Sequence, residues 1–441
     1  MPSVVAAATG VPADSGMTVA VIGLGYIGLS TAAALADGGV TVLGVDIDPE
    51  RVAAVASGTV TTDEADLTRL VRRACETGRL GASATPGPAD AFVIAVPTPL
   101  APDFTAELGH VFDAADAIAP FLRPGNLVIL ESTVPIGTTR RLAAHLAGWR
   151  PDLRFSGGDG AAVDVHVAHC PERVFPGRTV DEIRHNARVV GGLTAPSAAQ
   201  ARELYARFSS GPIAECSAET AEAVKLVENS FRDVNIAFAN ELAGICAVQG
   251  IDALEVIGLA NQHPRVSVLR PGIGVGGHCI PIDPWFLMQG APGHHRLLSA
   301  ARAVNAARPA AILDRVREAI TVLDPAGRGL TLLCYGLGYK ADTSDVRESP
   351  AVEIVAHLAA DPRLRIAVVD PFVARLPAPL AALGSVSLFP DIPAEAPDLA
   401  LVLVPHSGAA DALRRLDRDV PVLDPASLLP PGWRAPSGAG A

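Results

Sequence analysis

The feature that most constrains the fold is a short apolar run leading into a glycine-rich turn near the amino end. Met17–Ile22 is rich in β-branched residues, and it is followed by Gly23-Leu-Gly-Tyr-Ile-Gly28 and a helical pattern from Leu29 to Asp37. Strand, glycine turn and helix in this order are typical of dinucleotide-binding α/β domains, because the glycines let a pyrophosphate approach the helix N-terminus. The pattern therefore predicts a doubly wound, Rossmann-like domain.

A second predicted strand adds a carboxylate at the expected distance. Val40–Val45 ends in Asp46, 18 residues after Gly28, close to the spacing of the acid that binds the adenosine ribose. A carboxylate at this point would repel a 2′-phosphate, so we predict NAD rather than NADP as the cofactor. Arg51 complicates this prediction, since it could stack on adenine, tolerate a phosphate or be solvated.

Two more apolar runs end in polar, proline-containing turns. Ala91–Val96 precedes Pro97-Thr-Pro99, and Leu127–Leu130 precedes Glu131–Gly137. Ligands of open α/β sheets lie beyond the carboxyl ends of the strands, so Thr98 and Thr133 are expected to face the cofactor. The alternative is that each hydroxyl only caps a helix or a turn.

The carboxyl-terminal part repeats this order of elements. Its predicted strands are Leu330–Tyr335, Ile366–Asp370, Leu399–Val404 and Val420–Asp424. Gly336-Leu-Gly338 resembles the first glycine turn, but Lys340 and Ala341 stand where the third glycine would fall. We therefore predict a second doubly wound domain for another nucleotide, with Lys340 as a cationic phosphate partner.

Between these halves, residues 218–248 predict one long helix. The segment contains no proline, and apolar residues recur at helical spacing. Such a helix can join two domains and pack against its copy in a dimer. Lys225 and Asn229, four residues apart, share one helix face; an ordinary solvated polar stripe is the alternative.

Composition excludes several classes of function. The formal net charge of −12, without a cluster of basic residues, argues against nucleic acid as a partner. No apolar run approaches the roughly 20 residues of a membrane span. The six cysteines lack the close pairs of metal sites, so we expect no metal and reduced thiols in a cytoplasmic protein. Residues 1–16 lack the basic region of a secretory signal and predict a loose tail.

One cysteine lies in a glycine-rich loop. Pro271–Phe286 contains Cys279, closely preceded by four glycines, and Asp283 follows four residues later. Glycines beside Cys279 leave room for a ligand to approach, which favours a nucleophile. The loop alone does not exclude a buried structural cysteine.

Several motifs together resemble a known family. They are Gly23–Gly28, Val96–Pro99, Cys170–Val174, Glu228–Leu242, Gly274–Cys279 and Arg347–Pro350. On these motifs the chain is similar to the UDP-glucose/GDP-mannose dehydrogenase family, and Glu228–Leu242 and Gly274–Cys279 look like its amino-sugar branch. The resemblance runs from about Val19 to the last predicted strand.

The resemblance implies a four-electron oxidation of a sugar C6 hydroxyl to a carboxylate with two NAD⁺. UDP-N-acetyl-D-mannosamine is the implied substrate, ahead of UDP-N-acetylglucosamine and UDP-glucose. Cys279 would form a thiohemiacetal and then a thioester, while Lys225 and Asn229 would stabilise the oxyanion. Asp283 would position or activate water. Glu172 and Thr133 match residues of the hydrolytic or proton-transfer steps, and the base at each step stays open.

The resemblance also implies binding residues. Those for NAD are Gly23, Gly25, Tyr26, Ile27, Gly28, Asp46, Arg51, Pro97, Thr98, Thr133 and Arg347. Those for the UDP-sugar are Glu172, Arg173, Val174, Phe175, Lys225, Asn229, Arg265, Val275, Gly276 and Lys340. The family's arginine at the Arg265 position reaches into the partner subunit, which implies a homodimer or a higher homo-oligomer. A further basic residue that holds UDP is not assigned; Arg414 and Arg415 are candidates, and solvated arginines are the alternative.

The predicted fold class is α/β, with two Rossmann-like doubly wound domains joined by a central helical domain. The predicted segments are a tail at 1–16, an NAD-binding domain at 17–214, a central domain with the cysteine loop at 215–308, a UDP-sugar-binding domain at 309–433, and a tail at 434–441. Two rival functions stay open: a two-electron dehydrogenase of the β-hydroxyacid type, and an inactive NAD-binding scaffold or sensor. Counting the NADH formed per turnover separates them.

Overall fold

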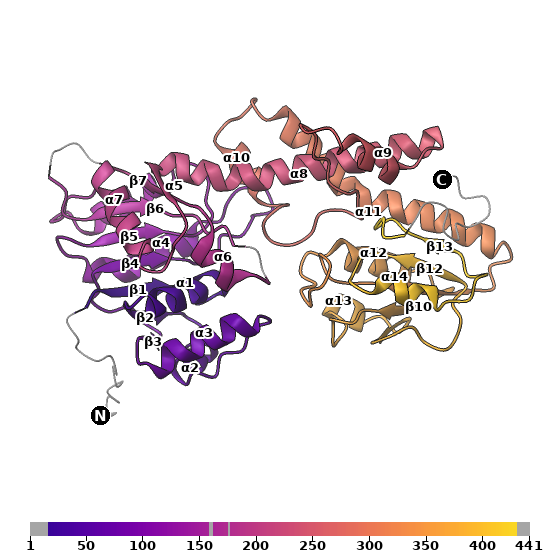
Figure 1. Ribbon diagram of the computed structural model, residues 1–441, viewed down its shortest axis with the longest axis horizontal. Helices are drawn as coiled ribbons and strands as arrows, with labels where there is room; N and C mark the ends of the chain where they lie inside the picture. Colours follow the sequence, from indigo (N-terminus) through magenta and orange to yellow (C-terminus); the bar gives the residue numbers. More distant parts are fainter. Residues whose placement is uncertain (1–15, 158–161, 175–176, 430–441) are drawn as a thin grey trace. The chain divides into compact units, whose positions relative to one another are not determined.

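The chain divides into two compact units, joined by one long helix. The structure is a computed structural model that describes residues 16–157, 162–174 and 177–429 (Figure 1). The first unit holds the chain up to Val227 and also Trp285–Gly290, and the second holds Glu228–Pro284 and the chain from Ala291. Helix α8, Ala218–Gln249, contributes to both units and confirms the predicted long helix. The predicted tails lie outside the described residues, apart from Gly16.

The first unit contains an eight-stranded sheet in the order β3-β2-β1-β4-β5-β6-β7-β8. All neighbouring strands are parallel except β6 and β7. The first six positions follow the doubly wound order, in which the strand order reverses between the parallel neighbours β1 and β4. The strands are β1 (Thr18–Ile22), β2 (Thr41–Val45), β3 (Leu80–Ser83), β4 (Ala91–Ile94), β5 (Leu127–Leu130), β6 (His166–His169), β7 (Arg188–Gly192) and β8 (Ile213–Ser217).

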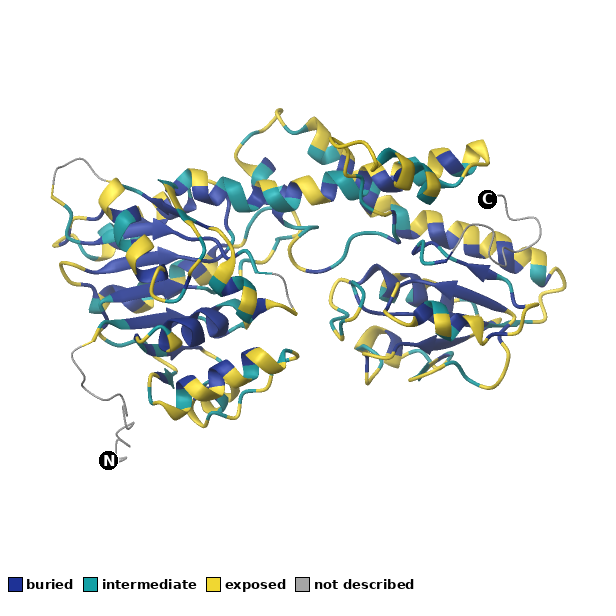
Figure 2. Cartoon of the chain, viewed as in Figure 1, coloured by how far each residue is buried: buried dark blue, intermediate teal, exposed yellow. Residues whose placement is uncertain are grey.

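Helices cover both faces of this sheet, so its inner strands are buried on both sides. Figure 2 shows these strands as buried, whereas the outward helix surfaces are exposed. The helices of this unit, besides α8, are α1 (Tyr26–Asp37), α2 (Pro49–Ala56), α3 (Ala65–Glu76), α4 (Gly109–Ile118), the 3₁₀ turn η1 (Ala119–Phe121), α5 (Thr138–Trp149), α6 (Thr179–His185) and α7 (Ala195–Tyr205). Most of α10 (Asp283–Gln289) also belongs to it.

The strand predicted at 91–96 is shorter in the structure, because its last two residues pass over the glycine turn. β4 ends at Ile94, and a Cβ on Gly23 would lie 2.7 Å from the carbonyl oxygen of Ala95. Gly23 also has a φ of 96°, which favours glycine. The close approach of these two turns shapes the carboxyl edge of the sheet at the point where β1 and β4 diverge.

The second unit contains a five-stranded parallel sheet in the order β11-β10-β9-β12-β13, which confirms the predicted second doubly wound domain. Its strands are β9 (Leu330–Tyr335), β10 (Leu364–Val369), β11 (Val386–Phe389), β12 (Leu399–Val402) and β13 (Val422–Leu423). Its helices, besides α8, are α9 (Ala253–Ala260), α11 (Arg296–Leu323), α12 (Pro350–Ala359), α13 (Ala378–Ala381) and α14 (Ala409–Arg414).

The two glycine turns share one hydrogen-bond pattern. In the first unit, the Leu24 amide donates to Asp46 Oδ2 over 2.7 Å; in the second, the Leu337 amide donates to Asp370 Oδ2, also over 2.7 Å. The second acid differs because His406 Nε2 lies 3.2 Å from Asp370 Oδ2, and both side chains are fully buried. The second glycine turn therefore keeps the backbone hydrogen bond of the first, but its aspartate is also hydrogen-bonded to a histidine.

In the part of the chain that the structure describes, no helix is both long enough and apolar enough to cross a membrane.

Candidate active site

The first glycine turn leaves open space where a phosphate group would approach. A Cβ on Gly28 would lie 1.9 Å from the carbonyl oxygen of Gly23, so only glycine fits there. By contrast, no described atom lies within 4 Å of the position that a Cβ on Gly25 would take. Gly25 is the N-cap of α1, and among the described residues no side chain caps that end. The turn therefore fits a dinucleotide pyrophosphate, held by the free amides of α1.

Asp46 and Arg51 lie together at the carboxyl end of β2. Asp46 is 7% exposed, and its Oδ1 accepts the Asp48 amide over 2.9 Å. Arg51 lies 3.5 Å from Asp46 Oδ2 and 3.3 Å from Asp48 Oδ2. The guanidinium is thus paired with two carboxylates, which favours a free ribose hydroxyl over a 2′-phosphate at this position.

The turns after β4 and β5 are hydrogen-bonded to each other. The Thr98 hydroxyl donates to the carbonyl oxygen of Thr133 over 2.7 Å, and the Ser132 hydroxyl donates to that of Val96 over 2.6 Å. Thr98 and Thr133 are therefore neighbours, as expected of turns at one edge of a sheet. The hydroxyl of Thr98 is used within the protein, whereas the half-buried Thr133 takes part through its backbone.

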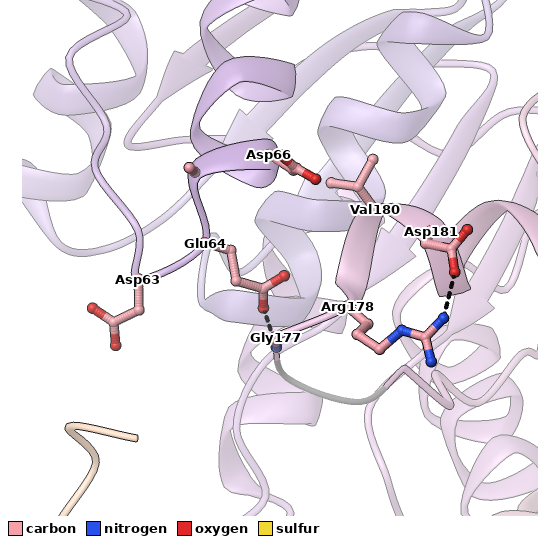
Figure 3. Close-up of a pocket in the computed structure, with 8 residues that line it drawn as sticks. Asp63, Glu64, Asp66, Gly177, Arg178, Val180 and Asp181 are labelled. Atoms are coloured by element: carbon pink, nitrogen blue, oxygen red, sulfur yellow. Dashed lines mark hydrogen bonds and ion pairs between the residues drawn. The ribbon is translucent and has the colours of Figure 1, made fainter. Parts of the chain in front are cut away.

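The Tyr26 hydroxyl forms hydrogen bonds that link the glycine turn to segments distant in the sequence. It bonds to Glu64 and Thr179, and Glu64 also accepts the amides of Gly177 at 2.7 Å and of Thr179 at 3.0 Å. Burial, with Glu64 next, raises the pKa of Tyr26. A cavity of about 540 Å³ lies beside these hydrogen bonds. It is lined by Asp63, Glu64, Ala65, Asp66, Gly177, Arg178, Val180 and Asp181 (Figure 3). These carboxylates would repel phosphate, so this cavity is not the nucleotide site.

Glu172 is buried in an ion pair that the sequence motif does not predict. Its Oε2 lies 3.2 Å from Arg188 Nη1, and both side chains are 5% exposed. Its Oε1 accepts the amides of Arg173 at 2.7 Å and Val174 at 3.1 Å. Glu172 therefore holds the following turn in place, while Arg173 itself donates to the carbonyl oxygen of Ala187 over 2.8 Å. The predicted Phe175 lies outside the described residues.

A second buried carboxyl group, Glu131, lies close to this pair. Glu131 Oε1 accepts the hydroxyls of Tyr205 at 2.8 Å and Thr31 at 3.1 Å. Its Oε2 has no hydrogen-bond partner among the described residues. Burial, followed by the charge of Glu172, raises the pKa of Glu131 from 4.5 to about 8. Glu131 is thus protonated near neutral pH.

Replacing Glu131 with glutamine should stabilise the protein increasingly as the pH rises. The folded protein keeps the Glu131 proton up to about pH 8, whereas the unfolded chain releases it near 4.5, so this group lowers stability between those values. Glutamine keeps the neutral form at every pH. We expect the Tm of Glu131→Gln to exceed that of the wild type by a margin that grows from pH 5 to pH 8. Parallel Tm profiles would show instead that Glu131 ionises normally.

Glu222 joins the start of α8 to the start of α5. Its carboxylate accepts the amides of Gly137 at 2.5 Å and Thr139 at 2.7 Å, together with the Thr139 hydroxyl at 2.6 Å. Glu222 is 1% exposed and stands one turn before Lys225 on α8. It therefore sets the position of Lys225 relative to the turn that contains Thr133. Sequence reasoning missed Glu222; its spacing of three from Lys225 was the available signal.

In the second unit, Cys279 lies directly before α10. It is exposed, and its carbonyl oxygen accepts the amides of Ile282 at 3.1 Å and Asp283 at 2.9 Å. Asp283 is 3% exposed, and the Asn229 amide donates to its Oδ2 over 2.5 Å. The second unit thus brings together three predicted catalytic residues: an exposed cysteine and a buried carboxylate that accepts a hydrogen bond from a half-buried amide. The other three, Thr133, Glu172 and Lys225, belong to the first unit.

The glycines of the cysteine loop pack against the carboxyl-terminal domain. A Cβ on Gly276 would lie 2.4 Å from the carbonyl oxygen of Glu348, and one on Gly277 would lie 2.9 Å from the Tyr339 ring. The Cys279 side chain, in its thiolate form, also contributes to raising the pKa of Tyr339 and of Arg347. For Tyr339 burial is the largest cause, and for Arg347 it is the hydrogen bond to Asp345. These glycines therefore serve close backbone packing.

The other predicted substrate residues lie in this unit as well. Val275 is half-buried beside Gly276, and Lys340 Nζ lies 5.7 Å from the centroid of the Tyr339 ring. Arg265 is exposed, and its amide donates to His263 Nδ1 over 3.3 Å. Arg415 is paired at the surface with Asp391, with Nη1 2.9 Å from Oδ2. This pairing makes Arg415 a weak candidate for holding UDP.

Comparisons with known proteins cover nearly the whole folded chain. Profiles of the UDP-glucose/GDP-mannose dehydrogenase family match in three parts: the NAD binding domain at residues 17–209, the central domain at 219–307 and the UDP binding domain at 333–428. A UDP-N-acetyl-D-mannosamine dehydrogenase of Escherichia coli (strain K12) is 47% identical over 394 residues, which cover 88% of this chain and 94% of that protein.

Two further proteins are similar over comparable lengths. An NDP-N-acetyl-D-galactosaminuronic acid dehydrogenase of Ralstonia nicotianae is 45% identical over 402 residues, 91% of this chain and 93% of that protein. Among solved structures, a UDP-D-ManNAc dehydrogenase from Pyrococcus horikoshii has a TM-score of 0.83 at 33% identity, and covers 96% of this chain and 100% of that one.

Proposed function

This chain belongs to the UDP-glucose/GDP-mannose dehydrogenase family, and we propose that it is an NAD-dependent nucleotide-sugar 6-dehydrogenase acting on UDP-N-acetyl-D-mannosamine. The product is the corresponding uronate. The observation that carries this proposal is the exposed Cys279 directly before α10, with the Asn229–Asp283 pair at the start of that helix. An exposed cysteine close to a hydrogen-bonded amide–carboxylate pair suits covalent capture of an aldehyde followed by hydrolysis.

The proposed chemistry balances over two oxidations and one hydrolysis. NAD⁺, when held by the first glycine turn, would supply the hydride acceptor for each oxidation. The Cys279 thiolate adds to the aldehyde carbon, and the resulting oxyanion takes a proton to give a thiohemiacetal. Loss of hydride and of the hydroxyl proton leaves a thioester. Water then attacks the carbonyl carbon, the sulfur leaves as thiolate, and the carboxylate is released. One alcohol, two NAD⁺ and one water thus become one carboxylate, two NADH and three protons.

The other predicted catalytic residues have proposed roles in this reaction. Lys225 and Asn229, one turn apart on α8, stabilise negative charge on the reacting oxygen. Asp283, held by Asn229, orients the attacking water. The buried pairing of Glu172 with Arg188 supports a role in shaping the substrate turn. Thr133, whose carbonyl oxygen accepts the Thr98 hydroxyl of the neighbouring turn, takes part in the hydrolytic or proton-transfer steps.

NADH formation over a panel of UDP-sugars tests the proposal. We expect two NADH per sugar and the highest kcat/KM with UDP-N-acetyl-D-mannosamine. UDP-N-acetylgalactosamine is the second candidate, because the Ralstonia protein is almost as similar to this chain. UDP-N-acetylglucosamine and UDP-glucose complete the panel.

Three outcomes would contradict the proposal. Activity confined to UDP-glucose would overturn the amino-sugar assignment. One NADH per sugar with a stable aldehyde would support a two-electron dehydrogenase. Tight NAD binding without turnover of any sugar would support an inactive scaffold.

We also propose that the enzyme is a homodimer formed through α8. Phe231, Phe238 and Ile245 recur every seven residues on α8 and are 66%, 54% and 54% exposed. Such a stripe suits burial against a second copy of the helix. Arg265, exposed after α9, would then reach the partner's site. The mechanism requires a reduced thiol, which favours a cytoplasmic location. For the domains, we propose the limits that were predicted from the sequence.

A further inference from the structure

Three asparagine side chains bind the backbone of the segment that leads into the cysteine loop. Residues 267–272 form no helix or strand. Asn235 accepts the Leu269 amide at 2.9 Å and donates to the Ser267 carbonyl at 2.8 Å, and Asn261 accepts the Val268 amide at 2.8 Å and donates to its carbonyl at 2.9 Å. Asn240 accepts the Gly272 amide at 2.9 Å. We call Asn235, Asn240 and Asn261 the asparagine clamp.

Asn240 differs from the other two because it is buried and held from behind. Asn240 is 3% exposed, and its amide donates to Asn305 Oδ1 over 3.0 Å. Asn305, on α11, donates in turn to Asp233 Oδ1 over 2.8 Å, and Arg302 Nη1 lies 2.6 Å from the same oxygen. The orientation of the Asn240 amide is therefore set by a buried chain of hydrogen bonds that ends in an ion pair.

Gly272 is held at both its amide and its carbonyl group. Arg308 Nε donates to the Gly272 carbonyl oxygen over 2.9 Å, while Asn240 accepts its amide. Two helices, α8 and α11, thus fix the peptide units on both sides of Gly272. The buried Asp233–Arg302 pair behind them would be costly to break, because either charge alone would be left uncompensated.

From Gly272 to Cys279 the loop has little freedom left. A Cβ on Gly274 would lie 3.2 Å from the Pro350 ring, and Gly276 and Gly277 pack against Glu348 and Tyr339. At the far end, the carbonyl oxygen of Cys279 accepts the amides of Ile282 and of Asp283, the first residue of α10. The place of the sulfur atom is therefore set by Gly272 upstream, by this packing surface along the loop, and by α10 downstream.

We propose that Asn240 is a positioning residue that sets the place of Cys279 for aldehyde capture, so that it acts on the second oxidation more than on the first. The inference rests on the proposed function. The first oxidation needs the alcohol, the cofactor and a base, whereas the second needs the thiol within bonding distance of the aldehyde carbon. A displacement of about 1 Å at a reacting group can lower a rate roughly a hundredfold. Loosening Gly272 therefore lets the aldehyde escape before capture.

The test is the number of NADH formed per sugar consumed by Asn240→Ala, with semicarbazide present to trap free aldehyde. We expect the ratio to fall from two towards one, with the missing product recovered as trapped aldehyde. A merely destabilised enzyme would lose active molecules, and the ratio for those that remain would stay at two. Arg308→Met, which removes the other hydrogen bond to Gly272, should shift the ratio in the same direction. This variant replaces Asn240→Ala in the test if Asn240→Ala fails to fold.

Asn126→Ala is the matched control. Asn126 is 2% exposed, donates to the carbonyl oxygens of Ala89 at 2.9 Å and Asp90 at 3.1 Å, and accepts the Arg123 amide at 2.8 Å. It lies at the amino end of β5, in the first unit. Its variant should lower the Tm but leave the ratio at two. A ratio of two for Asn240→Ala and Arg308→Met as well would overturn the inference. A ratio of one in the wild type would instead overturn the proposed function.

Discussion

Replacing Cys279 with alanine should abolish uronate formation while the enzyme stays folded. Cys279 is exposed, and the glycines of the loop around it pack closely against neighbouring residues. Without the sulfur there is no thiohemiacetal and hence no thioester to hydrolyse. We expect the rate of uronate formation to fall at least roughly a thousandfold, as when other covalent nucleophiles are removed. The measurement follows NADH and uronate separately.

Measuring NADH and uronate separately distinguishes the oxidation that forms the aldehyde from the steps that follow it. Cys279→Ala should still produce up to one NADH per sugar, because the first oxidation does not use the thiol. Cys216→Ala is the control, since this half-buried thiol lies in β8 and donates to the Val190 carbonyl oxygen of β7 over 3.8 Å. It should keep full activity. Release of uronate by Cys279→Ala at a normal rate would show that the mechanism is not covalent.

Replacing Lys225 should lower kcat strongly, even when the positive charge is kept. The chain contains only two lysines, Lys225 and Lys340, among 35 basic residues, so arginine serves at the other basic positions. An ammonium group is compact and can place one donor on a single oxygen, whereas guanidinium is planar and broader. We expect Lys225→Met to lose about 100- to 1000-fold in kcat, as for other oxyanion donors. Lys225→Arg should lose most of the same factor.

Lys340 provides the contrast for this experiment. A partner of the phosphate groups binds the ground state and the transition state alike, so Lys340→Met should raise KM with a smaller change in kcat. The anchor formed by Glu222 stays intact in the Lys225 variants, which keeps the start of α8 in place. Wild-type kcat in Lys225→Met would contradict a role in stabilising the oxyanion.

The regular elements of the fold were predictable where the sequence has strong periodicity. The strands β1, β2, β4, β5, β9, β10, β12 and β13 follow runs of β-branched or aliphatic residues, and α8 follows helical spacing over its whole length. The sequence pattern does not predict β3, β6, β7, β8 or β11. β6 has a histidine at each end, and β7 contains arginine and two glycines, so only pairing with neighbouring strands makes them strands.

The sequence motifs predict which groups react, but they do not predict the residues that support those groups. Cys279, Asp283 and Asn229 were found from the sequence, and the structure places an Asn229–Asp283 hydrogen bond beside the cysteine loop. Arg188 beside Glu172 and Glu222 beside Thr139 were not found. Each supports its partner from a distant part of the chain, and no local spacing encodes such a contact.

The glycine turns, the long helix and the reactive cysteine loop are local properties, because each depends on residues within a few positions of one another. The amino-acid sequence was therefore sufficient to predict two nucleotide-binding folds and the reaction type. Burial and long-range hydrogen bonds are properties of the folded chain. Only the tertiary structure shows that burial raises the pKa of Glu131 to about 8, that His406 is hydrogen-bonded to Asp370, and that Asn240 on α8 binds the Gly272 amide.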